Sequence, residues 1–269
     1  MNLLNIISSI EKIDPEVHDR LDTRRGAMQQ FAKIGGKIAM AAVPFALGSM
    51  FKTAYGQSTS DISSVLNYAL TLEYLEAEFY TKGAASGIVP VGTPAVGAIN
   101  TIRDHENAHV AFLITTLGSL GATPVSKPTF DFTAGGTFAN VFTNYDTFLA
   151  VAQAFEDTGV RAYKGRAGDL ISNHAVLTVA LQIHSVEARH ASHIRQMRKA
   201  RGANVKPWIT GNDTGGIGSA VQANYNGEEL TTQAGVNILN FVSASAASES
   251  FDEPLTANQV LAIIKPFIV

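Results

Sequence analysis

The sequence predicts an all-α protein built around a four-helix bundle, and three observations lead to this prediction. Four segments carry apolar residues at helical spacing, and each is more than twenty residues long. Sequences that break helices separate the four segments clearly. The connections differ in length, with the longest in the middle, which suits two helix hairpins joined by a linker.

The four expected helices cover about residues 62–82, 95–121, 145–170 and 174–202. Between them lie "GAASGIVPVGTP", "GATPVSKPTFDFTAGG" and "ISNH". A short connection implies that neighbouring helices are antiparallel, whereas a long connection permits a crossover. We therefore expect residues 57–203 to form the bundle, with the long linker between its two hairpins.

A C-terminal extension is expected over residues 204–269, where Gly, Asn, Ser and Thr dominate and the only tryptophan, Trp208, occurs. This composition predicts irregular structure packed on the bundle. One short helix is expected within "PLTANQVLAIIKPF", because Thr256 can cap it, Gln259 can reciprocate and Pro266 ends it. The apolar residues expected to dock this helix are Val260, Ile263 and Ile264.

The segment 1–56 differs from the rest of the chain and resembles a twin-arginine export signal. The pair Arg24 and Arg25 precedes a mostly apolar run over residues 38–51, and small residues follow. This apolar run is too short for an ordinary membrane span. Export would place the protein in the periplasm or outside the cell.

The alternative for residues 1–56 is a retained amphipathic helix, because the leading segment is unusually long and acidic for a signal. Retention would leave the protein in the cytoplasm. Without these residues the chain has 13 basic and 18 acidic side chains, a net charge of −5. We expect this part to be soluble, without a stable membrane span.

The composition excludes several classes of function. The whole chain has 20 basic and 23 acidic side chains, and the basic ones are scattered, so nucleic acid is not an expected partner. The chain has no cysteine, which excludes disulfides, thiolate metal sites and a cysteine nucleophile.

Polar residues on the inward face of the fourth helix give the first indication of a site. The stretch "HSVEARHASH" contains three histidines. On a helical wheel, Glu187 and His190 lie within the apolar stripe of this helix, whereas His184 and His193 lie at its edges. We therefore expect only the first pair to face the core, with His184 and His193 as flanking residues.

The second helix repeats this arrangement. Glu106 and His109 share the apolar stripe of that helix, and the words "ENAH" and "EARH" are both Glu-x-x-His. This spacing aims a carboxylate and an imidazole at one point from one helical face.

The first and third helices each place a glutamate inward without a histidine. These are Glu73 and Glu156, and a tyrosine follows each of them by seven residues, Tyr80 and Tyr163. Glu76 lies on a neighbouring face of the first helix. The spacing between the two glutamates almost equals the spacing between the two Glu-x-x-His motifs, so the bundle resembles a duplicated hairpin.

Four inward glutamates cannot all stay ionised in an apolar core, because buried carboxylates cost too much and repel one another. Two divalent cations would cancel their charge. Four carboxylates and two imidazoles without sulfur suit iron or manganese, and zinc is compatible. A single Glu-x-x-His is usually coincidence or a surface pair, and a lone inward glutamate can be a neutral core acid. Their recurrence at one spacing predicts a dinuclear metal site.

The stretches "LNYALTLEYLEAEFY", "FEDTGVRAYKG", "VEARHASHIRQ" and "SFDEPLTANQVLAIIKPF" resemble the ferritin-like superfamily, and specifically its desiccation-related branch, over about residues 62–269. The resemblance implies a ferritin-like four-helix bundle and two bound metal ions. The implied ligands are Glu73, Glu106, His109, Glu156, Glu187 and His190, with Glu76 as the alternative to Glu73. Without cysteine there is no rubredoxin-type module, which departs from full-length rubrerythrin.

Three hypotheses of function follow, two enzymatic and one not. The first is a di-iron protein of oxidative or desiccation stress that oxidises iron or reduces oxygen or peroxide, with an unidentified electron donor. Glu106 and Glu187 would bridge the ions, and Tyr80 and Tyr163 would orient ligands or donate an electron, unless they only pack. The second is disproportionation of peroxide, as in manganese catalases. The third is a protective protein whose metal only locks the bundle. A homo-oligomer is compatible with all three.

Overall fold

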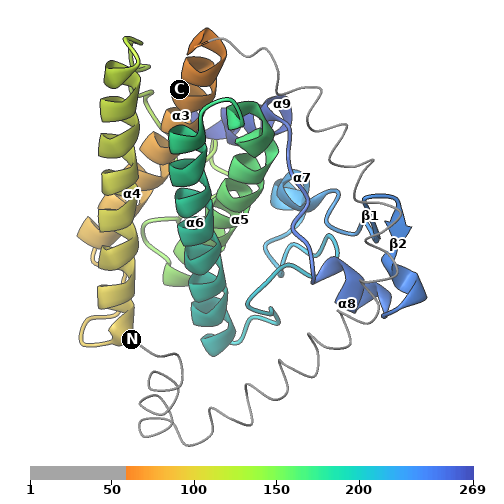
Figure 1. The fold of residues 1–269 in the computed structure, drawn as a ribbon. Helices are drawn as coiled ribbons and strands as arrows, with labels where there is room; N and C mark the ends of the chain where they lie inside the picture. Colours follow the sequence, from red (N-terminus) through yellow and green to blue (C-terminus); the bar gives the residue numbers. More distant parts are fainter. Residues whose placement is uncertain (1–58) are drawn as a thin grey trace, which may run out of the picture. The chain divides into compact units, whose positions relative to one another are not determined.

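The computed structural model describes residues 59–269, so the predicted export signal at 1–56 lies outside the described residues. Four long helices run side by side (Figure 1). They are α3 (Thr59–Ala85), α4 (Pro94–Ser119), α5 (Tyr145–Ala167) and α6 (His174–Ala200). α3 packs on α4, and α5 packs on α6, so each pair forms a hairpin. The predicted all-α bundle is confirmed.

The helix boundaries follow local signals in the sequence. Asn144 and Asn173 precede α5 and α6, and their side chains accept hydrogen bonds from the backbone N–H groups of Thr147 and Val176. α4 begins with Pro94, a residue whose fixed φ suits the first helical position. α5 is shorter than predicted because its last turn tightens into a 3₁₀ helix over Gly168–Leu170, a common ending of α-helices.

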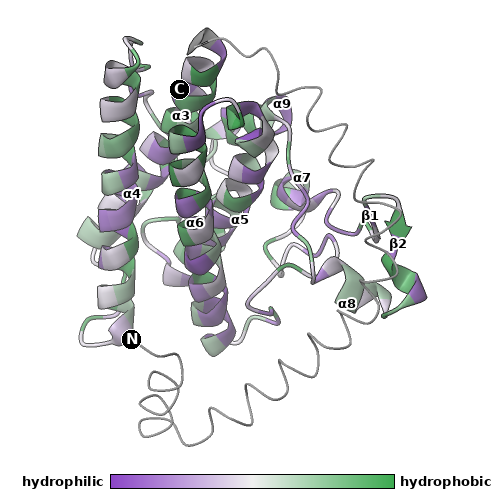
Figure 2. Cartoon of the chain, in the orientation of Figure 1, coloured by the Kyte–Doolittle hydropathy of each residue, from purple (hydrophilic) through white to green (hydrophobic). Residues whose placement is uncertain are grey.

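The core of the bundle consists of two apolar clusters with a polar layer between them. In α4, Ile99 and Ile102 belong to one cluster, and Leu113 and Leu117 belong to the other. α6 contributes to the same clusters in the reverse order. Figure 2 shows polar and apolar residues interleaved along the four helices, with the C-terminal half of α6 largely hydrophilic. The inward glutamates and histidines therefore lie in the middle of the bundle, between the two apolar clusters.

The C-terminal extension contains more helices than the single one predicted. Its elements are α7 (Gln222–Tyr225), β1 (Thr232–Gln233), β2 (Val236–Asn237), α8 (Ala244–Ser248) and α9 (Ala257–Ile264), with 3₁₀ turns at Ser219–Val221, Ile238–Asn240 and Lys265–Phe267. The two strands form a small sheet. Residues 59–233 and 237–269 belong to one compact unit.

The predicted last helix is present as α9. Thr256 and Gln259 form the expected reciprocal capping box. Val260 and Ile264 are buried in the apolar cluster that contains Ile99, as the predicted stripe requires. After α9 the chain pairs with the middle linker, because the N–H of Asp131 donates to the carbonyl of Phe267 and the N–H of Val269 donates to Thr129.

Buried arginines, among them Arg195 and Arg161, fasten the extension to the bundle, which the sequence analysis did not predict. Arg195 of α6 donates two hydrogen bonds to Asp157 of α5, at 2.9 and 2.5 Å, and a third to the carbonyl of Trp208. Arg161 of α5 lies 2.8 Å from Glu228 and donates to backbone carbonyls of the extension. Both guanidinium groups are thus paired with acidic side chains other than the inward glutamates. Within residues 59–269, no helix combines the length and apolarity needed to span a bilayer.

Candidate metal centre

The polar layer of the bundle receives side chains from all four long helices. The structure brings together all six ligands that the sequence analysis named. The four glutamates are fully buried, and His109 and His190 are 9% and 5% exposed. Carboxyl groups at this depth must be neutralised, either by protons or by positive charge close by.

The six residues form two overlapping groups of four. One group is Glu73, Glu106, His109 and Glu187, and the other is Glu106, Glu156, Glu187 and His190. In each group, one ligand atom from every residue lies within 4.8 Å of the others. The two groups share Glu106 and Glu187, the two residues that the sequence analysis assigned as bridging carboxylates.

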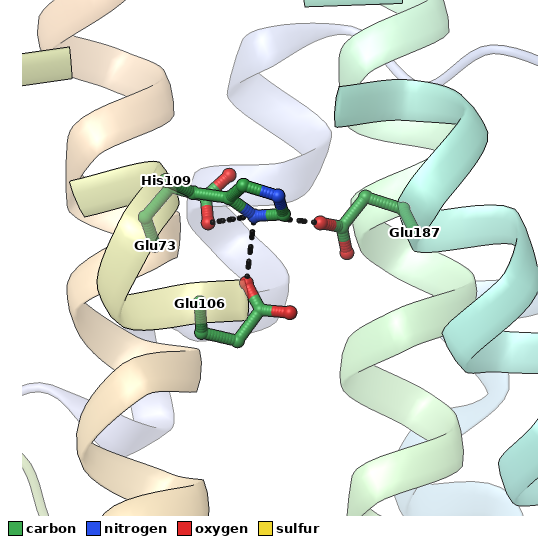
Figure 3. A group of neighbouring side chains, drawn as sticks. All are labelled: Glu73, Glu106, His109 and Glu187. Atoms are coloured by element: carbon green, nitrogen blue, oxygen red, sulfur yellow. Dashed lines mark hydrogen bonds and ion pairs between the residues drawn. The ribbon is translucent and has the colours of Figure 1, made fainter. Parts of the chain in front are cut away.

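His109 is surrounded by three carboxylates (Figure 3). Its Nδ1 lies 3.1 Å from Oε2 of Glu73, 3.1 Å from Oε2 of Glu106 and 3.4 Å from Oε1 of Glu187. A ring nitrogen carries at most one proton and cannot satisfy three acceptors equally well. A cation among these four groups could accept electron pairs from all of them.

His190 approaches the carboxylates in a similar way from α6. Its Nδ1 lies 2.8 Å from Oε1 of Glu106 and 3.3 Å from Oε2 of Glu156. The nitrogen is nevertheless not aligned for a hydrogen bond with either oxygen. Its lone-pair direction is therefore available to a third partner.

The orphaned oxygen atoms of the layer test whether the site fits a metal. Oε1 of Glu106, Oε2 of Glu156 and both carboxylate oxygens of Glu187 are buried without a hydrogen-bond partner. Buried polar atoms normally have partners, and leaving one unsatisfied costs about 1–3 kcal/mol. Four such oxygens in one layer beside two imidazoles fit the donor set of a pair of hard or intermediate divalent ions.

The metal-free electrostatics show which groups hold protons. Burial raises the pKa of Glu73 to about 7 and raises the pKa values of Glu156 and Glu187 as well. Burial also acts on Glu106, but the two neighbouring imidazoles outweigh it and lower the pKa of that carboxyl to about 2. The layer without metal is therefore kept near neutrality by protons on its carboxyl groups.

The two histidines show the opposite shift. Burial alone would lower the pKa of each imidazole, but the surrounding carboxylates raise both pKa values to about 10. Metal binding requires neutral histidine and ionised glutamate, so it must release these protons.

The two tyrosines connect the hairpins across the layer. Tyr80 of α3 donates a hydrogen bond of 2.5 Å to Oε1 of Glu156, and Tyr163 of α5 donates one to Oε1 of Glu73. Each phenol thus holds the inward glutamate of the opposite hairpin. Burial raises the pKa values of both phenols, so they remain protonated donors.

A fifth carboxylate, Glu76, is buried in the same layer at 4% exposure. Its pKa is raised well above 4.5, first by burial and then by repulsion from Glu156 and Glu106. It belongs to neither group of four, whereas Glu73 belongs to one of them. Gly159 leaves room for it, because a Cβ there would lie 3.4 Å from Oε1 of Glu76 and 2.9 Å from Oε2 of Glu187.

One histidine at the site was missed by the sequence analysis. Nδ1 of His105 lies 2.9 Å from Nε2 of His190, on the side of the ring away from the carboxylates. The signal was its position in α4, one turn before His109 and next to Glu106. Of the two histidines expected to flank the site, His193 is exposed and His184 is half-buried.

Comparison with known proteins finds one family model that matches the chain. It is described as a ferritin-like domain and matches residues 61–200, which include all six named ligands. No curated protein matches the chain.

Proposed function

Because the chain belongs to the ferritin-like domain family, we propose that it holds two divalent metal ions, with iron favoured, and uses them in redox chemistry with oxygen or peroxide. The family match confirms the predicted resemblance to the ferritin-like superfamily. The ferritin-like domain and the buried cluster of carboxylates and histidines are compatible with a di-metal protein. The resemblance to the desiccation-related branch and the role in stress stay predictions.

The observation that carries the proposal is the pair of overlapping four-residue groups with Glu106 and Glu187 in common. Two ions held in these groups would be neighbours, because the shared carboxylates belong to both. The orphaned oxygens of Glu106, Glu156 and Glu187 supply the unsatisfied acceptors that such ions would use. Two divalent ions would offset four ionised carboxylates, which removes the need for the protons that the metal-free layer holds.

The proposed ligand roles follow from the two groups. Glu106 and Glu187 would bridge, Glu73 and His109 would hold one ion, and Glu156 and His190 would hold the other. When bound, a pair of reduced iron ions would be oxidised and would supply the electrons that reduce oxygen or peroxide.

The rest of the bundle prepares the site for this chemistry. The two apolar clusters on either side of the layer exclude water, which strengthens electrostatic interactions inside it. Tyr80 and Tyr163 hold one oxygen each of Glu156 and Glu73, so the other oxygen of each carboxylate faces the centre. The phenolic protons are available at these same two oxygens.

The metal content of the full chain tests the proposal. The double variant Glu106→Gln, Glu187→Gln removes the two shared carboxylates and keeps their shape. We expect about two metal ions per wild-type chain and none retained by the double variant, measured by elemental mass spectrometry. Glu78→Gln is the matched control, because Glu78 also lies on a long helix but forms its ion pairs with the exposed Lys82 and Lys127. Two ions retained by the double variant would overturn the proposed site.

The loaded protein then separates the three hypotheses. Oxygen uptake by the iron-loaded protein supports the di-iron function. Oxygen evolution from peroxide by the manganese-loaded protein instead supports a catalase-like function with the same ligands. If the metal raises the melting temperature but neither loaded form turns over, the metal has a structural role, and the redox function is contradicted.

A further inference from the structure

We propose that His105 is a positioning residue for His190 and that it makes the two metal positions of the centre inequivalent. This inference rests on the proposed function and adds to it a residue outside the six ligands. It predicts that the position held by His190 binds its ion more tightly than the position held by His109.

The contact between the two histidines is specific. His105 Nδ1 and His190 Nε2 are 2.9 Å apart, and the two rings are nearly parallel, with centroids 5.2 Å apart and an angle of 17° between their planes. His105 reaches this contact from α4 and His190 from α6, which are neighbouring helices of different hairpins. The contact therefore fixes the ring of His190 from outside the polar layer.

The hydrogen bond also fixes the tautomer of His190. Nδ1 of this ring faces Glu106 and Glu156, so it is the nitrogen that would bind a metal ion through its lone pair. The ring proton must then lie on Nε2, from which it is donated to Nδ1 of His105. A partner of this kind holds the ring in orientation and makes the ligating nitrogen a better electron donor.

The other hairpin has no equivalent of this contact. His109 uses Nδ1 towards its carboxylates, and no hydrogen-bond partner of its Nε2 is found among residues 59–269. Val186 follows His105 by the same number of residues as His190 follows His109, so Val186 is the counterpart of His105 in the second hairpin. Valine has no side-chain hydrogen-bond acceptor, so this position cannot do for His109 what His105 does for His190.

His105 contributes little else to the fold. Its side chain belongs to the exposed surface of α4, and replacing it leaves the two apolar clusters intact. A variant at this position is therefore expected to fold, and its effect should be confined to the metal centre.

Calorimetric titration of the metal-free full chain with Co²⁺ tests the inference. For the wild type we expect two binding steps of different affinity. His105→Val should weaken one step by about 10–100-fold, the usual effect of removing a partner of a metal-bound histidine, and leave the other unchanged. It should also alter the visible absorption of the Co²⁺ bound first. Neither signal depends on turnover.

Three further variants make the test specific. His105→Gln should restore most of the affinity, because the amide oxygen can accept the same hydrogen bond. His193→Val, a change of the same type at an exposed histidine of α6, should alter neither step. Val186→His should strengthen the weaker step, because it offers a ring nitrogen at the position equivalent to His105.

The outcomes separate this inference from the proposed function. A wild-type chain that binds no Co²⁺, Fe²⁺ or Mn²⁺ would overturn the proposed function and the inference with it. Two bound ions whose affinities and spectra are the same in the wild type and in His105→Val would overturn the inference alone. Loss of affinity in His105→Gln as large as in His105→Val would also contradict it, because a hydrogen-bond acceptor would then not be what matters.

Discussion

At the scale of single residues, Glu106 and Glu187 occupy matching places in the two hairpins but have different surroundings. Glu106 lies beside two imidazoles, which lower its pKa to about 2 against the effect of burial. Both oxygens of Glu187 lack a hydrogen-bond partner, and burial raises its pKa well above the usual range. Without metal, Glu187 therefore holds a proton, and a bound cation would replace that proton.

The pKa shifts predict how the stability of the metal-free protein depends on pH. The pKa of Glu73 is raised from 4.5 to about 7, and those of His109 and His190 are raised from 6.5 to about 10. A raised pKa stabilises the fold at low pH, and this stabilisation is lost as pH rises through the folded-state value. The metal-free melting temperature should therefore fall as pH rises from about 5 to about 9.

Bound metal should reverse this trend, because it takes the place of the displaced protons. The increase in melting temperature on adding metal should grow with pH, as measured by scanning calorimetry with and without metal. The double variant Glu106→Gln, Glu187→Gln should show no increase at any pH. A metal effect of constant size across the pH range would contradict the assignment of these protons to the site.

Gly159 is predicted to be needed for metal binding, because its lack of a side chain leaves space for the carboxylate of Glu187. A Cβ at this position would lie 2.9 Å from Oε2 of Glu187, so Gly159→Ala must displace that buried carboxylate. We expect metal affinity to fall by about 10-fold or more, since shifts next to ligands cost this much. Gly97→Ala in α4 is the matched control, because a Cβ there meets nothing within 4 Å. If titrations gave the same metal affinity for both variants, the space beside Gly159 would be unimportant for metal binding.

At the scale of elements, α5 joins the metal centre to the C-terminal extension. Nearly every residue from Phe148 to Tyr163 is buried, which is typical of a helix that is covered on all sides. Glu156 faces the polar layer, whereas the next residue, Asp157, binds Arg195 and the hydroxyl of Tyr225. Two successive carboxylates of α5 thus have different roles: Glu156 belongs to the site, and Asp157 helps to anchor the extension.

Asp157→Ala should destabilise the fold by about 3–5 kcal/mol, because it leaves the buried guanidinium of Arg195 without its counter-charge. The free energy of unfolding in urea measures this effect. Glu78→Gln breaks ion pairs with the exposed Lys82 and Lys127 and should cost less than about 1 kcal/mol. If both variants lost equally little, the network around Asp157 would not be what fastens the extension to the bundle.

At the scale of the whole molecule, the two hairpins carry the same residue pattern, as in a duplication, but differ at the centre. The three proposed ligands and the tyrosine of the first hairpin recur in the second at the spacings that lead from Glu73 to Glu156 and from Glu106 to Glu187. At the same spacings, Glu76 corresponds to Gly159 and His105 corresponds to Val186. The half with the extra carboxylate also supplies the histidine that contacts His190, so the two four-residue groups differ in their surroundings.

Export belongs to the scale of the whole chain and stays a prediction from its sequence. Replacing both Arg24 and Arg25 by lysine should abolish recognition as a twin-arginine signal. In a bacterium with this export pathway, we expect the wild-type chain in the periplasm without the segment 1–56, and the variant uncut in the cytoplasm. Lys33→Arg is the control for a basic change elsewhere in the segment. A full-length wild-type chain in the cytoplasm would favour the retained helix.

The sequence by itself predicted the four helices and the six inward ligands. Helical periodicity depends on backbone hydrogen bonds four residues apart, so the face on which Glu106 and His109 lie can be read locally. The tertiary structure decided which groups meet across helices. The reciprocal contacts of Tyr80 and Tyr163, the contact of His105 with His190 and the burial of Asp157 all depend on how the helices are rotated and shifted against one another. Packing of the whole core sets those offsets, and no single helix contains them.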